Sequence, residues 1–238
     1  YTVLMAQGYV PNAMNMWSST LDELSRYHER ILAGQEGADT PPMQHQPLFG
    51  IGHPIHTDLR ELVGEFYLSQ AALLGERTAQ LHQSLGEATD MPAFQPEPFS
   101  ALYLRSLFQS MRALTRRTFQ HLRTAGDHLA PDLQSRVHDL VAQEPVLIDY
   151  LRSLLSGRID AMKIRIHGDY HLAQVLYTGK DFLIIDFEGE PSRALSERKI
   201  KHSPFKDVAG MIRSFHYVAH LSLTASPAIR PEDAQYLK

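Results

Sequence analysis

Hydrophobic residues recur at helical spacing through most of the first 155 positions. Glycine- and proline-rich stretches near 34–54 and 91–99 interrupt this pattern. Thr20 with Glu23 three positions later is typical of a capping box, and Pro131 suits the first position of a helix. The periodicity predicts four helices, over about 20–32, 58–85, 100–125 and 131–155. Core packing alone explains the apolar spacing of 55–157, so we expect this stretch to be scaffold.

The hydrophobic period shortens after residue 160. Three short runs favour β-strands, at 163–167, 175–178 and 182–187. The turn residues 178–181, Thr-Gly-Lys-Asp, predict that the second and third runs form a hairpin. Another short strand is expected over 2–10, and Pro204 opens a last predicted helix that runs to about Leu221. The sequence therefore predicts a mainly α fold with a small β hairpin.

Polar side chains gather around that hairpin, in IRIHGDYHLAQVLYTGKDFLIIDFEGEP (164–191). Asp169 follows Gly168, whose backbone freedom permits a tight loop, and an Asp projected from a loop can accept a proton from a hydroxyl group. Gln174 comes five positions later and Asp186 seventeen positions later. Amide and carboxylate oxygens facing each other across a hairpin suit Mg²⁺. Protein kinases use the same order of groups, so the pattern favours phosphoryl transfer.

Simpler interpretations of single residues stay open. An Asp beside a Gly is often only a turn residue. His167 and His171 have the spacing of a zinc pair, but no cysteine or helical Glu-x-x-His context accompanies them, and His167 is expected to hold the shape of the loop. Asp207, in SPFKDVAGM, is either a first-turn acid that interacts with the helix dipole or an acceptor for backbone N–H groups of the loop. A basic run forms a solvated face or neutralises phosphate charge: Arg193, Arg198, Lys199, Lys201 and Lys206.

Composition removes several classes of function. The chain has 238 residues, a net charge of −4 and no cysteine. It lacks the basic footprint of a nucleic-acid-binding protein, and disulfides and thiolate nucleophiles are excluded. No apolar run reaches the roughly 18 residues needed to span a membrane, so we expect neither a nucleic acid nor a membrane as partner. The residues fit a reducing compartment, and we expect a cytoplasmic protein. The chain lacks an initiator Met and is expected to be part of a longer one.

Several motifs resemble one family. HGDYHLAQVL resembles the catalytic loop of the aminoglycoside phosphotransferase-like kinases, whose core is H-G-D-x-H-x-x-N, with Gln174 in place of the Asn. Within that superfamily, the Gln at this position resembles the bacterial maltokinases. Four further segments resemble the same proteins: IIDFEGEP, RALSERKIKHSPFKDVAGMIRSF, LLGERTAQLH (73–82) and YVPNAMNMW (9–17). The resemblance covers most of the chain and is strongest over 164–217. It implies a protein-kinase-like C-terminal lobe whose N-terminal lobe is missing.

The resemblance also implies roles and boundaries. Residues 1–12 would be the end of the N-lobe and the interlobe hinge, and 13–238 the helical C-lobe, truncated at both ends, with its catalytic loop at 164–178 and its metal-binding Asp strand at 182–191. Asp169 would be catalytic, and Gln174 and Asp186 would hold Mg²⁺. The remaining assignments are backbone contacts to the adenine of ATP from Gln7, Tyr9 and Val10, support of the loop by His167 and Asp207, and substrate contacts by His171 and Arg193.

The implied reaction is ATP-dependent phosphorylation of an alcohol group. The resemblance points to maltose as the acceptor and maltose 1-phosphate as the product, in trehalose and α-glucan metabolism, with a trehalose synthase as fused or associated partner. One alternative is a related kinase that acts on an aminoglycoside, choline or a different sugar. A second is a catalytically silent C-lobe that serves as an interaction domain, because no glycine-rich phosphate loop and no N-lobe Lys–Glu pair precede Tyr1.

Overall fold

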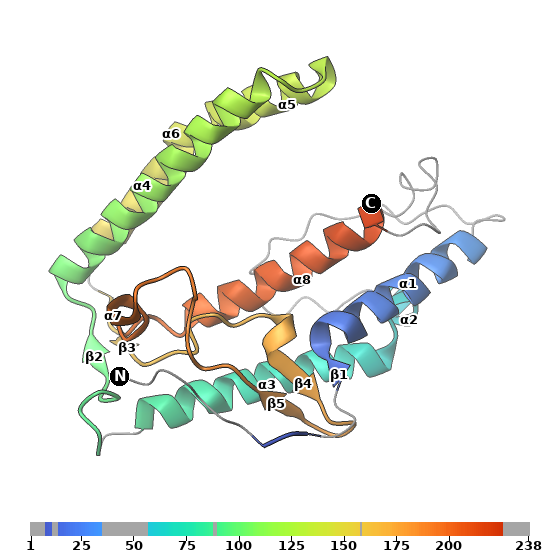
Figure 1. Cartoon of the computed structure of the whole chain (residues 1–238), viewed down its shortest axis with the longest axis horizontal. Helices are drawn as coiled ribbons and strands as arrows, with labels where there is room; N and C mark the ends of the chain where they lie inside the picture. Colours follow the sequence, from blue (N-terminus) through green and yellow to red (C-terminus); the bar gives the residue numbers. More distant parts are fainter. Residues whose placement is uncertain (1–7, 11–13, 35–56, 88–89, 158, 226–238) are drawn as a thin grey trace. The chain divides into compact units, whose positions relative to one another are not determined.

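A computed structural model of the chain describes residues 8–10, 14–34, 57–87, 90–157 and 159–225 (Figure 1). The described residues form two compact units. One unit combines the segments up to Gln95 with those from Ile164 onward, and the other is Pro96–Lys163. The polar cluster of the sequence lies in the first unit.

The first unit carries a three-stranded antiparallel sheet in the order β1-β4-β5. Its strands are β1 (Met14–Asn15), β4 (Val175–Tyr177) and β5 (Phe182–Ile184). The predicted hairpin is confirmed, since Val175 pairs with Ile184 and the Thr178 N–H donates to the Asp181 carbonyl at 2.9 Å. Strand β1 was not predicted, and it pairs with β4 through Met14 and Tyr177.

The first unit also contains helices. They are α1 (Met16–Gly34), α2 (Thr57–Val63), α3 (Glu65–Glu87), α7 (Leu195–Arg198) and α8 (Phe205–Ala225), with a short 3-10 turn, η2 (Leu172–Gln174). Helix α8 is the predicted helix after Pro204. The core joins α1, α3, η2, the hairpin and α8 through the buried residues Met16, Leu74, Tyr170, Leu172, Val175, Phe182, Met211 and Val218. Because Tyr170 and Leu172 belong to this core, the polar loop is built directly on it.

Two predicted helices have different bounds. Helix α1 begins at Met16, and its first turn is capped by Asn15, whose Oδ1 accepts from the Ser18 N–H at 2.9 Å. The predicted capping box at Thr20 is therefore wrong, since the Thr20 hydroxyl lies within the helix and donates to the Met16 carbonyl at 2.6 Å. The single helix predicted over 58–85 is divided into α2 and α3 at Gly64, which has a φ of 91°. A left-handed residue cannot continue a right-handed helix.

The second unit is a helical hairpin. Its helices are α4 (Ala101–Gly126), α5 (Pro131–Ala142) and α6 (Glu144–Arg152), followed by the 3-10 turn η1 (Ser153–Leu155). Short strands β2 (Glu97–Pro98) and β3 (Met162–Lys163) pair at its base. Pro131 begins α5 as predicted, but the expected helix over 131–155 is interrupted at Gln143, just before Pro145. Pro145 has no N–H to donate, so the helix breaks there and restarts.

The ends of the predicted β segments also differ. The run at 163–167 contributes only Lys163 to β3, and Ile164 forms an isolated bridge with His202. Gly8, Tyr9 and Val10 lie in no strand, while 2–7 and the loop at 35–54 lie outside the described residues. None of the helices that the structure describes combines the length and apolar character needed to cross a bilayer.

Candidate active site

The predicted catalytic loop turns at Gly168, which has a φ of 86°. His167 is almost fully buried, with 1% of its surface exposed. Its Nε2–H donates to the Ile185 carbonyl at 2.8 Å, and its Nδ1 accepts from the Asp169 N–H at 3.3 Å. A carbonyl oxygen can only accept, so these contacts fix the tautomer with the proton on Nε2. His167 thus links Asp169 to the backbone just before Asp186.

The Asp207 carboxylate lies beneath the loop, in the first turn of α8. Its Oδ2 accepts from the His167 N–H at 2.8 Å and its Oδ1 from the Gly168 N–H at 2.9 Å. A third contact joins Oδ2 to the His82 Nε2 at 3.0 Å. Burial alone would raise the pKa of Asp207, but the hydrogen bonds from His82, Gly168 and His167 outweigh it and hold that pKa below its ordinary value. Asp207 is therefore an ionised acceptor, and its predicted contact with the loop backbone is present in the structure.

Gln174 and Asp186 meet at the open end of the hairpin. The Gln174 Nε2–H donates to Asp186 Oδ2 at 2.9 Å, and Asp186 has a left-handed φ of 62°. Asp186 follows β5 by two residues, so it sits in a turn beyond the strand. The amide oxygen of Gln174 and the carboxylate of Asp186 are hard donors of the kind that Mg²⁺ prefers. A half-turn of the Gln174 amide would direct its oxygen to a cation, so the two side chains fit this ion.

These two residues would form only part of a coordination shell. In the described part of the chain, no group of three or more His, Cys, Asp or Glu side chains could hold a metal ion. Mg²⁺ usually keeps several waters and shares itself with substrate phosphates. A pair of oxygen donors on an exposed turn is consistent with a metal that arrives with a nucleotide.

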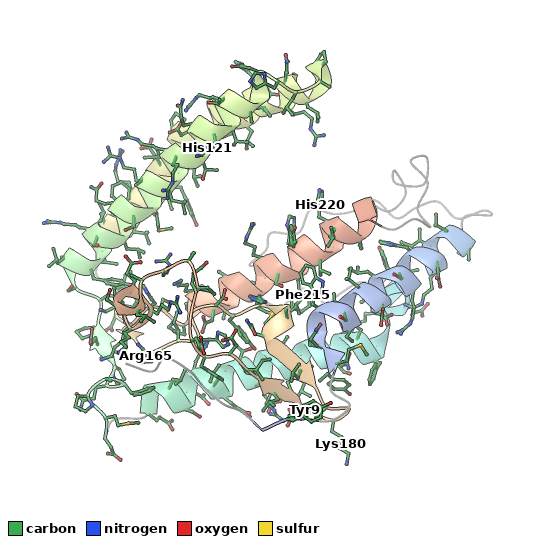
Figure 2. All side chains as sticks on the ribbon, in the orientation of Figure 1. Tyr9, His121, Arg165, Lys180, Phe215 and His220 are labelled. Carbon is green, nitrogen blue, oxygen red and sulfur yellow. The ribbon has the colours of Figure 1, made fainter. Side chains whose placement is uncertain are left out.

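Of the residues assigned to substrate and nucleotide, His171 approaches Asp169, whereas the others that the structure describes form no hydrogen bond or ion pair with it. His171 Nε2 is 3.8 Å from Asp169 Oδ2 and thus faces the predicted base. Arg193 is exposed, and its carbonyl accepts from the Arg198 Nε–H at 2.9 Å. Tyr9 has 90% of its surface exposed (Figure 2), Val10 is partly buried in the same irregular stretch, and Gln7 lies outside the described residues.

The basic run proves heterogeneous. Arg198 binds backbone, since its Nη2–H donates to the Pro191 carbonyl at 2.8 Å. Lys201 is buried, and its ammonium group donates to the Pro92 carbonyl at 3.4 Å. The pKa of Lys206 is lowered by burial and by the nearby charge of Arg193, against the opposing effects of Asp207, Glu190 and Asp169. The run is therefore not a uniform solvated face.

Helix α3 supplies contacts that the sequence did not predict. The Thr78 hydroxyl is 2.8 Å from the Tyr170 hydroxyl, and Arg77 forms a two-pronged ion pair with Asp181 at 2.7 and 3.1 Å. With His82, three residues of LLGERTAQLH thus contact the loop, the hairpin or Asp207. The signal available was the spacing of 74, 78 and 82, which puts these positions on one face of a helix.

Gly210 of α8 approaches the same loop closely. A Cβ atom at this position would lie 2.8 Å from the Tyr170 carbonyl oxygen, closer than real Cβ contacts allow. Only glycine lets the helix and the loop backbone come this near. The loop is therefore held by α8 at Asp207 and Gly210. A third contact comes from Ser214 of α8, whose Oγ accepts from the Leu172 N–H at 3.2 Å.

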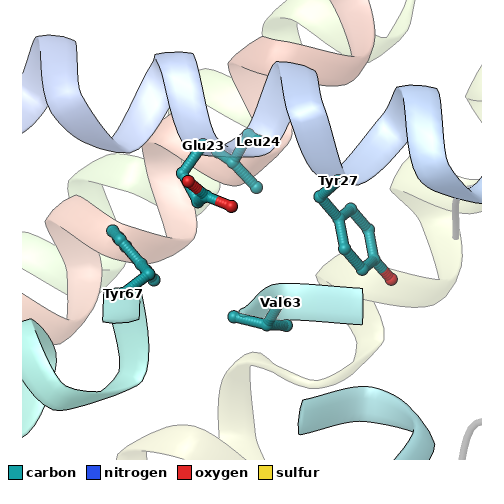
Figure 3. A pocket seen from close by; sticks show the side chains of 5 residues that line it. All are labelled: Glu23, Leu24, Tyr27, Val63 and Tyr67. Carbon is teal, nitrogen blue, oxygen red and sulfur yellow. The ribbon is translucent and has the colours of Figure 1, made fainter. Parts of the chain in front are cut away.

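Two hollows of the first unit lie away from the predicted catalytic residues. A small one of about 90 Å³ is lined by Glu23, Leu24, Tyr27, Val63 and Tyr67 (Figure 3). A larger apolar groove of about 440 Å³ runs between α3 and α8 and includes His82, Phe205 and Phe215 (Phe215 is labelled in Figure 2). Neither lining contains Asp169, Gln174 or Asp186.

The fold and the loop define a class. A catalytic-type loop precedes a β hairpin, an amide and a carboxylate meet at its end, and a buried acid of a core helix binds the loop backbone. This is the C-terminal lobe of a kinase-like protein. Residues 55–189, more than half of the chain, match the phosphotransferase enzyme family APH, and the chain belongs to that family.

Relatives of known structure have the same fold. The glucosamine kinase of Streptacidiphilus jiangxiensis is 25% identical over 181 residues, which are 73% of this chain and 37% of that protein. A solved glucosamine kinase in complex with glucosamine, ADP and inorganic phosphate matches 96% of this chain and 46% of its own, with a TM-score of 0.66 and 20% identity. A second solved structure, glucosamine kinase in crystal form A, has a TM-score of 0.67 and 20% identity, and the match covers 96% of this chain and 43% of that one. The chain spans less than half the length of these relatives.

Proposed function

We propose that this chain is the C-terminal lobe of an ATP-dependent sugar kinase. The observation that carries the proposal is the position of Asp169 on a loop whose two preceding backbone N–H groups are held by Asp207, in the same segment of chain in which Gln174 and Asp186 meet. The family match supports a phosphotransferase. Phosphoryl transfer to a hydroxyl requires a proton acceptor and oxygen donors for a metal, and Asp169, Gln174 and Asp186 are of those types.

In this mechanism Asp169 orients the acceptor hydroxyl and accepts its proton. The hydroxyl oxygen then forms a bond to the γ-phosphorus of ATP while the bond to the bridging oxygen breaks, which leaves ADP and a sugar phosphate. His171, at 3.8 Å from the Asp169 carboxylate, would contact the sugar or the transferred group, as would Arg193. Mg²⁺ held by Gln174 and Asp186 would neutralise the charge of the phosphates.

The nucleotide would meet the start of the chain. Residues 1–12 would form the hinge between two lobes, and the backbone groups of Gln7, Tyr9 and Val10 would contact adenine. Residues 13–238 would then be the helical C-lobe. A reaction that consumes ATP belongs in the cytoplasm, where we place the protein.

The acceptor we favour is maltose, phosphorylated at its anomeric hydroxyl to maltose 1-phosphate. The resemblance of HGDYHLAQVL and IIDFEGEP to maltokinases supports it, and it would connect the enzyme to trehalose and α-glucan metabolism through a fused or associated trehalose synthase. Glucosamine is the second candidate, because the similar proteins reported above are glucosamine kinases. The two acceptors differ in the amino group and in the second sugar ring.

The test uses the full-length natural protein, ATP with Mg²⁺, and a panel of maltose, glucosamine, choline and an aminoglycoside. We expect sugar phosphorylation, and Asp169→Asn should lower kcat by about 10²- to 10⁴-fold, the usual contribution of a general base. Asp181→Asn is the matched control, because Asp181 lies at the far end of the same hairpin. Turnover of Asp169→Asn near that of the control would overturn the assignment.

Titration of ADP and Mg²⁺ into the 238-residue chain addresses the silent-domain alternative. A C-lobe without a glycine-rich loop contributes only part of the phosphate site, so the expected affinity is weaker than micromolar. Micromolar binding would show that the chain carries a complete nucleotide site.

A further inference from the structure

One face of α3 is directed at the catalytic loop. Leu74, Thr78 and His82 follow each other at intervals of four, so they form one stripe along the helix. Leu74 belongs to the core, and Thr78 contacts the Tyr170 hydroxyl. His82, the last of the three, ends the stripe at Asp207 with 11% of its side chain exposed. The stripe thus changes from the apolar Leu74 to the polar Thr78 and His82 as it approaches Asp207.

The His82 contact completes the set of donors around Asp207. The carboxylate receives two hydrogen bonds from the loop backbone and one from His82 Nε2 at 3.0 Å. Burying an ionised carboxylate is costly unless its oxygens are bonded. The first two donors belong to the loop that Asp207 must hold, so within the described ranges His82 is the donor that binds the carboxylate from a different element.

Two other polar side chains of the same region, Thr78 and Lys206, make no hydrogen bond to Asp207 among the described contacts. The Thr78 hydroxyl donates to the Leu74 carbonyl at 2.8 Å, so its contact with Tyr170 must be a bond that the tyrosine hydroxyl donates. Lys206 adjoins Asp207 in the first turn of α8, where burial lowers the pKa of Lys206 and the charge of Asp207 opposes that shift. No hydrogen bond or ion pair between the two occurs among the described residues. His82 is therefore the side chain that orients Asp207.

We propose that His82 is a positioning residue for phosphoryl transfer. Its imidazole fixes the Asp207 carboxylate, the carboxylate fixes the backbone N–H groups of His167 and Gly168, and these fix the direction of Asp169. The proposal rests on the proposed function only in taking Asp169 as the base. It assigns a role to LLGERTAQLH that packing alone does not supply.

Two substitutions separate positioning from packing. A Gln at position 82 keeps an N–H donor that can reach Asp207, whereas a Leu of similar bulk has none. His82→Leu should lower kcat by up to about 100-fold, as for a reacting group displaced by roughly 1 Å, with little change in the KM for ATP. His82→Gln should restore most of the loss. Arg77→Gln is the control on the same helix, since Arg77 contacts only the hairpin turn and its neighbours on α3.

The pH profile reports the link through Asp207. Without the His82 donor the Asp207 carboxylate loses one of the bonds that keep its pKa low, so the acid limb of kcat should move to higher pH in His82→Leu and return in His82→Gln. Tyr170 and Lys206 are the other titratable groups whose charges act with Asp207, and both remain unchanged in these variants. An unmoved acid limb in His82→Leu would overturn the proposal.

Amide exchange tests the same link without any catalysis. In the 238-residue chain, the amides of His167 and Gly168 should exchange faster in His82→Leu than in wild type and in Arg77→Gln. Equal exchange would contradict the positioning role even if the protein proves to be a sugar kinase, and faster exchange would support it even if no sugar is phosphorylated. Should His82→Leu not fold, the wild-type chain decides, since a slowly exchanging imidazole proton on His82 Nε2 is expected and its absence overturns the proposal.

Discussion

Asp207 and Asp186 are both joined to the segment 164–191 and are held in opposite ways. Asp207 has 2% of its surface exposed and receives three hydrogen bonds from two separate elements. Asp186 is exposed, has a left-handed backbone and receives one side-chain hydrogen bond, from Gln174. The side of the loop that touches the core is fully bonded by the protein itself, and the side that faces solvent keeps carboxylate oxygens available. The two carboxylates thus differ in burial and in the number of hydrogen bonds that the protein supplies to them.

The strongest test of this contrast makes the same chemical change at both positions. Asp207→Asn replaces one oxygen by an NH₂ group that faces an N–H donor, so at least one buried donor loses its acceptor. Leaving a buried donor unpaired costs about 1–3 kcal/mol, and we expect the free energy of unfolding to fall by about 2 kcal/mol or more. Asp186→Asn should change it by less than about 0.5 kcal/mol, as for most surface positions.

Urea unfolding of the two variants measures both changes. The loop amides of His167 and Gly168 should lose exchange protection only in Asp207→Asn. Equal destabilisation of the two variants would break the comparison, because it would mean that Asp186 is braced as firmly as Asp207.

A second, smaller effect is expected at the close approach of α8 to the loop. Gly210→Ala would place a Cβ atom 2.8 Å from the Tyr170 carbonyl oxygen, and overpacking of this kind costs about 1–3 kcal/mol. The higher helix propensity of Ala offsets about 1 kcal/mol of this, so the variant should still be less stable than wild type. Gly75→Ala on α3 is the matched control, because no atom lies within 4 Å of its added Cβ and the propensity gain should appear alone.

Thermal or urea unfolding measures both variants. If this packing is correct, the free energy of unfolding falls in Gly210→Ala and rises in Gly75→Ala. Stabilisation by Gly210→Ala would show that α8 and the loop are farther apart than described. The hydrogen bonds of Asp207 and Ser214 to the loop backbone would then remain as the links between the two segments.

The smallest effect concerns Tyr170, on the buried side of the loop. Tyr170→Phe removes the hydrogen bond to Thr78, worth about 0.5–1.5 kcal/mol. Burial raises the pKa of Tyr170 to about 12, and the charge of Asp207 adds to the shift. A raised pKa stabilises the folded protein fully below the unfolded value of 10.0, and this contribution is lost as the pH rises toward 12.

Measuring the free energy of unfolding between pH 10 and 12 checks the direction of this pH dependence. The stability difference between wild type and Tyr170→Phe should shrink as the pH rises from 10 toward 12, because the variant has no phenol to ionise. A constant difference would indicate that the Tyr170 hydroxyl is solvated, and the buried side of the loop would be less closed than the structure shows.

Local patterns in the sequence predicted the parts of the site that lie close together along the chain. The hairpin, its turn at 178–181 and the helix after Pro204 followed from hydrophobic period and turn residues, and the structure confirms them. The Asp169, Gln174 and Asp186 spacing predicted a site that the structure assembles as far as the Gln174–Asp186 contact. Their catalytic and metal-binding roles stay predictions.

Contacts between distant segments were not predictable in this way. His82 and Asp207 are 125 positions apart. The helical spacing that puts His82 on the same face as Leu74 and Thr78 does not identify its partner. The prediction of where α1 starts was wrong for a related reason. Thr20 with Glu23 satisfies the capping rule, but the cap that forms uses Asn15, which also pairs in β1. The position of the helix start therefore depends on strand pairing with a distant segment, which the sequence of one tetrapeptide does not reveal.

The same 125-residue separation has a consequence for how the protein is made. At roughly 5–20 residues per second of synthesis, about 6–25 s pass between the addition of His82 and that of Asp207. During that interval the His167 and Gly168 amides emerge from the ribosome before the carboxylate that binds them. A nascent or prematurely terminated chain can thus carry the whole HGDYH motif while its loop has no acceptor. Order in the catalytic loop is a property that appears only when the helix after Pro204 has been synthesised and has packed.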